Sequence, residues 1–213
     1  MPSELLIDRL VGELKPVRHR RMTTDVMIVA VLCAIELALF LMIGAERSDI
    51  PVAMTLPSFW WKLGSLGAIA AVSGAVAILS FDPTEKPRRG LRLLVAMTAL
   101  CVVPALLIDA VPDGFAGLAS RLSWRDGIDC VCHIAALSAP LVIGLGWLMR
   151  RGAPTDAGGT ALAVGATAAA WGGFVFVFAC PQDDPVYVVV WYAVGCGLVI
   201  AAVRWILPRL TRW

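Results

Sequence analysis

The sequence predicts an all-α membrane protein, a bundle of six transmembrane helices. Of its 213 residues, 59% are hydrophobic and only 16% are charged, whereas an ordinary soluble domain is about 45–50% apolar. A helix needs about 20 apolar residues to cross a bilayer. Six runs approach this length, at residues 26–45, 63–81, 91–107, 131–149, 160–179 and 186–207. Because lipid offers the backbone no hydrogen-bond partner, and no barrel-like alternation is present, each run is expected to be helical.

The placement of Lys and Arg predicts how the bundle is oriented. Cytoplasmic loops carry an excess of these residues, and 14 of the 18 lie in the N-terminus, the second and fourth loops and the C-terminus. The other four are Arg47, Lys62, Arg121 and Arg125. Both termini are therefore expected in the cytoplasm. The net charge of +2 reflects this asymmetry and gives no reason to expect a direct nucleic-acid partner.

Residues 1–22 are expected to form a separate cytoplasmic segment, with residues 23–213 as the transmembrane domain. The segment carries an apolar stripe at helical spacing, made of Leu6, Ile7, Leu10, Val11 and Leu14. An amphipathic helix of this kind must bury its apolar face. Two surfaces are available, the inner face of the lipid bilayer or a groove on a partner protein. Acidic residues on its other face are repelled by anionic lipid, so a protein partner is favoured.

The first span carries an acid, Glu36, near its middle. An ionisable side chain at this depth is costly unless it faces the interior of the bundle with a partner. Two roles remain open at this point. Glu36 is either a functional site for a proton or ion, or a structural hydrogen-bond partner of a neighbouring helix.

Spans two and five contain ridges of small residues at helical spacing, which let helices approach closely. Both ridges are therefore expected to face neighbouring helices, and they consist of Gly64, Ala68, Ala71, Ala75, Gly165, Ala169 and Gly173. Span two is preceded by three aromatic residues and Lys62. This pattern is typical of an interfacial aromatic belt with a lysine that reaches out to water.

The fourth and fifth spans are joined by a short loop and predict a helical hairpin. Span four begins at Cys130 and span five ends near Cys180, so the two cysteines should lie at the same depth on the outer side. Neighbouring helix axes lie 8–10 Å apart, which can bring two such side chains within reach of a disulfide. A periplasmic face is also where disulfides persist. The other cysteines, Cys33, Cys101 and Cys196, are expected to be small packing residues within spans.

Cys132 and His133 leave the chemistry of this end open. Residues i and i+2 of a regular helix point about 200° apart, so only one of Cys130 and Cys132 should face Cys180. If the helix begins just after Cys130, a soft-metal site becomes feasible, and its candidate ligands are Cys130, Cys132, His133, Cys180, Asp183 and Asp184. The alternatives for the cysteine pair are a permanent link between the two helices or a reversible redox or thiol-metal switch. Asp183 or Asp184 is a candidate cap of span six or a support for a metal ligand.

Several stretches of the chain match a known pattern in order. They are LIDRL at residues 6–10, LKPVR at 14–18, WWK at 60–62, CVCHI at 130–134, RRGAP at 150–154 and CPQDDPVYVVVWYAVG at 180–195. In these stretches the chain resembles the NrsF-type integral membrane anti-sigma factors, and the last stretch is the most specific. The resemblance covers nearly the whole chain.

The resemblance implies a protein that holds an extracytoplasmic-function sigma factor at the bacterial inner membrane. Release follows when two periplasmic cysteines meet heavy-metal or oxidative stress. By position the cysteines are Cys130 and Cys180, and the sigma-binding element is the N-terminal helix at residues 5–17. Such a protein is not an enzyme and has no obligatory cofactor, although heavy metal can bind transiently at its cysteines. Cys132 departs from the family pattern and leaves open whether the thiols act as a simple pair.

Two functions from other classes are also considered. A quinone-linked membrane thiol-disulfide oxidoreductase would need a redox-active pair of cysteines, and Cys130 with Cys132 comes closest to one. A small transporter would use Glu36 as its ion site, but the sequence shows neither inverted repeats nor broken helices.

Overall fold

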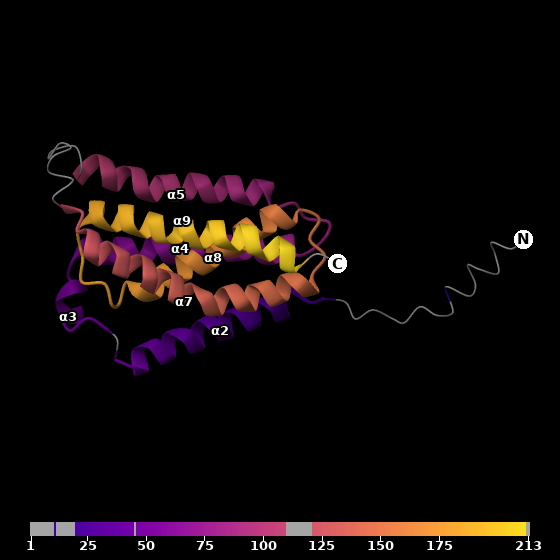
Figure 1. Ribbon diagram of the computed structural model, residues 1–213, viewed down its shortest axis with the longest axis horizontal. Helices are drawn as coiled ribbons and strands as arrows, with labels where there is room; N and C mark the ends of the chain where they lie inside the picture. Colours follow the sequence, from indigo (N-terminus) through magenta and orange to yellow (C-terminus); the bar gives the residue numbers. More distant parts are fainter. Residues whose placement is uncertain (1–10, 12–19, 45, 110–120, 212–213) are drawn as a thin grey trace, which may run out of the picture.

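The structure, a computed structural model, describes residues 11, 20–44, 46–109 and 121–211. All regular secondary structure in these residues is helical, and six of the helices are long and apolar enough to cross a membrane. The expected all-α fold with six candidate spans is confirmed. Figure 1 shows the long helices side by side. The described helices are α2 (Met22–Met42), α3 (Ile50–Ala53), α4 (Pro57–Ser80), α5 (Arg88–Asp109), α7 (Trp124–Arg151), α8 (Ala157–Phe176) and α9 (Pro185–Leu210).

The amphipathic helix expected within residues 1–22 lies almost wholly outside the described residues. Of its apolar stripe only Val11 is described, and this residue is helical and exposed. Leu6, Ile7, Leu10 and Leu14 therefore keep the status of a sequence prediction. Figure 1 places the start of α2 and the end of α9 at the same end of the bundle.

The six long helices begin before the apolar runs that predicted them, and α2, α4 and α8 also end before those runs do. The largest difference is in α7, which begins at Trp124 rather than at residue 131. Its first residues include Arg125 and Asp126, because a helix satisfies its own backbone groups and need not stop where the apolar run stops. Cys130 consequently lies inside a regular helix rather than at its start.

The centre of the bundle is α8, which packs against α4, α7 and α9. Of its most apolar window, 83% is buried, compared with 6% for α2 and for α5. Glycines allow this close packing. A Cβ atom at Gly165 would lie 3.0 Å from the Ile200 Cα atom of α9, and one at Gly172 would lie 2.8 Å from the Ile134 carbonyl oxygen of α7. The backbones of α7 and α8 are therefore in near contact, and this fixes their hairpin.

The ridge of small residues predicted on α8 is confirmed, whereas the one predicted on α4 is wrong. On α8, Ala169 is fully buried. On α4 all four predicted residues, Gly64, Ala68, Ala71 and Ala75, face outward. The buried face of α4 instead contains Ser73 and Ser80, whose hydroxyl groups donate to backbone carbonyls of α4 itself.

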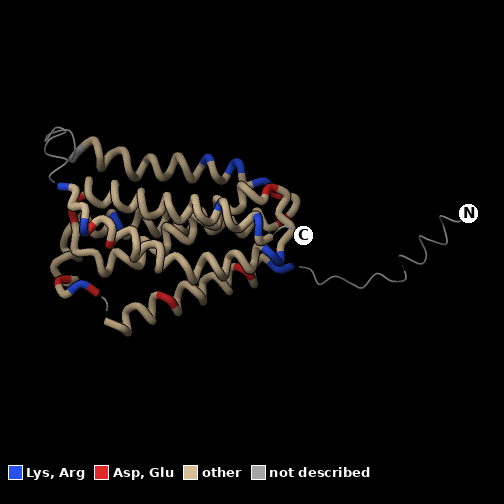
Figure 2. The backbone as a smooth tube through the Cα atoms, viewed as in Figure 1, with Lys and Arg blue, Asp and Glu red and all other residues tan. Residues whose placement is uncertain are grey.

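The charges divide between the two ends of the bundle. Figure 2 shows most of the Lys and Arg residues gathered where α2 begins and α9 ends. The opposite end carries acidic residues and a few cations, among them Arg47 and Lys62. The asymmetry that the sequence shows is thus also an asymmetry in space.

We predict that Gly172→Ala destabilises the bundle. The added Cβ atom would meet the Ile134 carbonyl oxygen and the Ser138 amide nitrogen, both at 2.8 Å, and backbone atoms cannot move aside without separating α7 from α8. Overpacking of this kind costs about 1–3 kcal/mol. Thermal denaturation in detergent should show a lower midpoint. Gly64→Ala, which has nothing within 4 Å of its Cβ position, is the control and should not lower it. Equal midpoints for the two variants would contradict the α7–α8 contact.

Candidate functional site

The hairpin of α7 and α8 brings Cys130 and Cys180 together at one end of the bundle. Cys130 is 4% exposed and Cys180 is fully buried, and both belong to one apolar cluster. The two thiols are neighbours, since the Cys130 thiol is the main influence on the pKa of Cys180. All six cysteines of the chain are free. The structure therefore holds two neighbouring reduced thiols with little access to solvent.

Cys180 is positioned by the connection between α8 and α9. Its backbone N–H donates to the Phe176 carbonyl at 2.9 Å, which places Cys180 directly above the end of α8. Asp184 then caps α9 and accepts from the backbone N–H groups of Val186 at 2.9 Å and Tyr187 at 3.2 Å. This cap places the Tyr187 hydroxyl 3.4 Å from the Cys130 sulfur. Of the two roles left open for Asp184, the structure shows the helix cap.

Cys132 and His133 do not join the pair. Because α7 is already helical from Trp124, Cys132 points away from Cys130 and is exposed. The His133 ring stacks on Phe176 with centroids 5.2 Å apart, and its Nδ1 atom lies 2.7 Å from the Asp129 carbonyl oxygen. The six candidate metal ligands are thus not brought together. Among the described residues, no group of three His, Cys, Asp or Glu side chains is arranged to hold a metal ion.

Asp183 binds two cations that hold the connection to the rest of the bundle. Lys62 donates through Nζ to the Asp183 carboxylate at 3.0 Å and to the Gln182 carbonyl at 2.7 Å. Arg47 donates to both oxygens of the same carboxylate, at 3.1 Å and 2.9 Å. The prediction that Lys62 reaches out to water is wrong. Its side chain is 0% exposed, because an ion pair with Asp183 replaces water at this depth.

Arg47 and Arg121 complete the polar contacts of this end. Arg47 also donates to the Cys180 carbonyl at 3.0 Å and to Asp49 at 2.6 Å, and Arg121 donates to Asp184 at 2.6 Å. Burial alone would raise the pKa values of Asp183 and Asp184. The hydrogen bonds from the cations outweigh it and lower both. Both acids are therefore charged at neutral pH.

Sequence reasoning missed three residues that surround the pair, Arg47, Lys62 and Tyr187. The distribution of Lys and Arg along the sequence could have indicated Arg47 and Lys62. Arg47, Lys62 and Arg121 are three of the four basic residues that lie away from the basic end, and each of the three pairs with an acid of the 183–184 dipeptide. A cation on the unexpected side thus indicates a partner there.

The surroundings favour the ionised form of Cys180. A hydrogen bond from the Cys130 thiol is the main reason that the pKa of Cys180 is lowered. Burial opposes this effect, and a backbone hydrogen bond at Gln182 and the charge of Lys62 reinforce it. Thiolates are the reactive form of cysteine and the form that binds soft metals. This arrangement can bridge a soft metal ion between two sulfurs or close to a disulfide.

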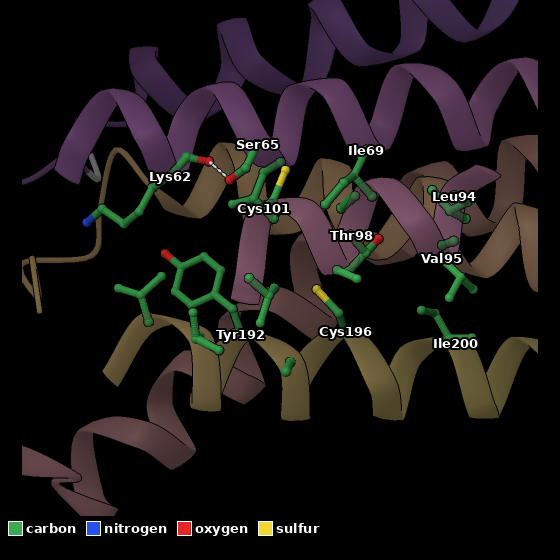
Figure 3. Close-up of a pocket in the computed structure, with 18 of the residues that line it drawn as sticks. Lys62, Ser65, Ile69, Leu94, Val95, Thr98, Cys101, Tyr192, Cys196 and Ile200 are labelled. Atoms are coloured by element: carbon green, nitrogen blue, oxygen red, sulfur yellow. Dashed lines mark hydrogen bonds between the residues drawn. The ribbon is translucent and has the colours of Figure 1, made fainter. Parts of the chain in front are cut away.

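A cavity of about 640 Å³ lies between α4, α5, α8 and α9. Figure 3 shows Lys62, Ser65 and Tyr192 among its lining residues, with Ser65 donating to the Lys62 carbonyl oxygen at 3.1 Å. Most of its other lining side chains are apolar. Such a lining suits a hydrocarbon chain better than an ion, and it offers no support for the transporter alternative.

Glu36 has a structural contact in the bundle. Its carboxylate accepts a hydrogen bond of 3.1 Å from the indole N–H of Trp171 on α8. This is the structural role that the sequence left open, a hydrogen bond to a neighbouring helix. Two of the cysteines expected to pack within spans, Cys33 and Cys196, do lie against the apolar core, while Cys101 lines the cavity.

We predict that Cys130→Ala raises the pH at which Cys180 reacts with an alkylating agent. Without the Cys130 thiol the Cys180 thiolate loses its main stabilising hydrogen bond, so the pKa of Cys180 moves up and the thiolate fraction at neutral pH falls. A rise of one unit makes the reaction about tenfold slower below the pKa. The alkylation rate against pH, followed by mass spectrometry of the Cys180 peptide, measures it. Cys132→Ser should leave the profile unchanged, and a profile shifted equally by both substitutions would contradict the pairing.

Comparison with known proteins identifies the family. The family model described as negative regulator of sigma F, NrsF, matches residues 10–213. The chain is 29% identical over 178 residues to the probable anti-sigma-F factor NrsF of Azospira oryzae, covering 78% of each chain. It is 29% identical over 188 residues to the anti-sigma-F factor NrsF of Caulobacter vibrioides, covering 83% of each. No solved structure matches. These relatives are regulatory proteins rather than enzymes, and the chain belongs to the NrsF family of negative regulators of sigma F.

Proposed function

We propose that this anti-sigma factor works at the bacterial inner membrane and holds an extracytoplasmic-function sigma factor through its cytoplasmic N-terminal segment. Release follows when Cys130 and Cys180, at the periplasmic face, react with a heavy-metal ion or an oxidant. The observation that carries the proposal is the buried pair of neighbouring thiols, and the lowered pKa of Cys180 supports it. Membership of a family of sigma regulators supplies the partner class.

The sidedness of the proposal rests on charge. The end of the bundle where α2 begins carries most of the basic residues, and such an end faces the cytoplasm in most membrane proteins. The N-terminal segment then lies on the side where a sigma factor is found, and the cysteine pair lies on the opposite side. A periplasmic location also exposes the thiols to incoming metal ions and oxidants before these reach the cytoplasm.

The sensing chemistry needs both sulfurs. A soft metal ion bridges the two thiolates after both protons are released. Alternatively, an oxidant takes two electrons and two protons leave, so that an S–S bond forms. A ligand shifts a conformational equilibrium only through its different affinity for the two states. A bridge between α7 and the α8–α9 connection supplies such a difference, because it draws together two thiols that are now neighbours without a covalent bond.

If the N-terminal segment binds the sigma factor as proposed, Leu10→Glu together with Leu14→Glu should abolish co-purification of the sigma factor. The two charges would lie in the apolar stripe, where burying an unpaired carboxylate costs several kcal/mol. Affinity purification of the tagged chain from its host in mild detergent, followed by mass spectrometry, measures the loss and identifies the sigma factor. Glu13→Gln, on the polar face of the segment, is the control and should retain the partner. Retention by the double variant would show that another surface binds the sigma factor.

The proposed role of the two thiols in sensing predicts that Cys130→Ser together with Cys180→Ser leaves the sigma factor bound under stress. Serine cannot bridge a soft metal or form a disulfide, so cadmium and chromate lose their effect. A reporter driven by the promoter of the identified sigma factor should rise with either agent in the wild type and stay at its basal level in the double variant. Cys132→Ser should respond like the wild type, since Cys132 lies away from the pair. Normal induction in the double variant would end the sensing proposal.

A further inference from the structure

The proposed function leaves open how a reaction at one end of the bundle reaches a segment at the other. The helix α2 has the right connectivity, because it directly follows the N-terminal segment. It is also an unbroken rod. Of the six candidate spans, α2 alone contains neither glycine nor proline, the residues that most often bend a helix. A displacement at one end of α2 is therefore carried to its other end.

α2 is also, with α5, one of the two spans that are least buried in the bundle. Only 6% of its most apolar window is buried in the bundle, against 83% for α8. Packed interiors resist small shifts because every neighbour must move as well. The core helices α4, α7, α8 and α9 are held in this way by glycine contacts such as those at Gly165 and Gly172. α2 has fewer such contacts, among them the hydrogen bond of Glu36 to Trp171 and the packing of Leu32 against Gly144, so it is less constrained than the core helices.

Arg47, five residues after the last residue of α2 and beyond the turn at Gly44, binds the connection that carries Cys180. Its backbone N–H donates to the Phe178 carbonyl at 2.9 Å, and its guanidinium donates to the Cys180 carbonyl at 3.0 Å. The same guanidinium forms two bonds to Asp183, at 3.1 Å and 2.9 Å. The side chain is only 5% exposed. Arg47 is therefore bonded directly to the backbone around Cys180, so a movement of Cys180 acts on Arg47.

The chemistry of this contact requires arginine. Asp49 binds the guanidinium on its other edge, at 2.6 Å and 2.7 Å, and so fixes its orientation. A planar guanidinium can donate hydrogen bonds to two carboxylates and a carbonyl at once, whereas a lysine ammonium acts as a point charge. When Cys180 shifts toward Cys130, its carbonyl and Asp183 move together, and Arg47 must follow or lose its bonds.

We propose that Arg47 is the positioning residue that couples the Cys130–Cys180 pair to α2, and through α2 to the N-terminal segment. The inference rests on the proposed function and adds the route by which the thiol reaction is transmitted. Arg47 takes no part in the thiol chemistry itself. Its loss should therefore separate two events that are coupled in the wild type, the reaction of the thiols and the release of the sigma factor.

The test compares Arg47→Met with Arg121→Met in the full-length chain, bound to the sigma factor identified by co-purification. Arg121 is the matched control because it also binds an acid of the connection, Asp184 at 2.6 Å, but it lies next to α7 and not at the end of α2. Cadmium chloride is the probe. Protection of Cys130 and Cys180 from alkylation reports the thiol reaction, and the amount of sigma factor retained on the chain reports release.

In Arg47→Met the thiols should bind cadmium as in the wild type while the sigma factor stays bound. The cadmium-induced change in sigma affinity should fall from the roughly 5–150-fold that is typical of coupled sites to less than about twofold. Arg121→Met should bind cadmium and release the sigma factor normally. Arg47→Lys, which keeps a charge for Asp183 but cannot also reach Asp49 and the Cys180 carbonyl, should lose release as well. It provides a second folded variant if Arg47→Met is unstable.

Three outcomes would overturn the inference. They are normal release in both Arg47 variants, an equal loss of release in Arg121→Met, and a folded Arg47 variant that fails to bind the sigma factor before cadmium is added. A different result bears on the proposed function. If the wild-type chain binds cadmium at both thiols and keeps its sigma factor, thiol sensing itself fails, and the Arg47 inference fails with it.

Discussion

The carboxylate of Asp183, shared by Arg47 and Lys62, is the interaction on which the cysteine end depends. Both cations are almost fully buried, and a buried charge is stable only with a partner. Removing one member of a buried ion pair costs about 3–5 kcal/mol, because the other charge remains without water or partner. The cluster of Arg47, Lys62, Asp49 and Asp183 is neutral as a whole, so its members hold one another in place. The Cys180 carbonyl accepts a hydrogen bond from Arg47 of this cluster, while the Cys180 backbone N–H is held separately by the Phe176 carbonyl at the end of α8.

Much of the architecture could be predicted because it follows from one-dimensional properties. Hydropathy and length indicated the six spans, and the short loop after α7 indicated the hairpin that brings Cys130 near Cys180. The partners of Lys62 could not be predicted in this way. Asp183 is distant from Lys62 in the sequence, and a lysine beside aromatic residues at a span boundary looks the same whether it reaches water or an acid. Only the packing of α4 against the α8–α9 connection decides between them.

The faces of the helices were predicted unevenly for a physical reason. On α8 nearly every face is covered, so any ridge of small residues is buried, and Ala169 is an example. On α4 two opposite faces carry small residues, and lipid is as apolar as a helix surface, so small size alone does not select one face. The hydroxyl groups do select it. The Ser73 and Ser80 side chains donate to backbone carbonyls of α4 on the face turned away from lipid, which makes the serines a better guide than Gly64 or Ala75.

Burial also limits which agents can reach the two thiols. Cys180 is fully buried and Cys130 nearly so, whereas Cys132 on the same helix is exposed. If the pair is the sensing element, a bulky thiol reagent meets Cys132 first, while a metal ion or a small oxidant needs only a small opening of the connection held by Asp183. A bridging ion also needs two sulfurs, which Cys132 alone cannot supply. Selectivity for small, soft agents then follows from the packing around Cys180 rather than from the thiols themselves, since two exposed cysteines would react with any electrophile.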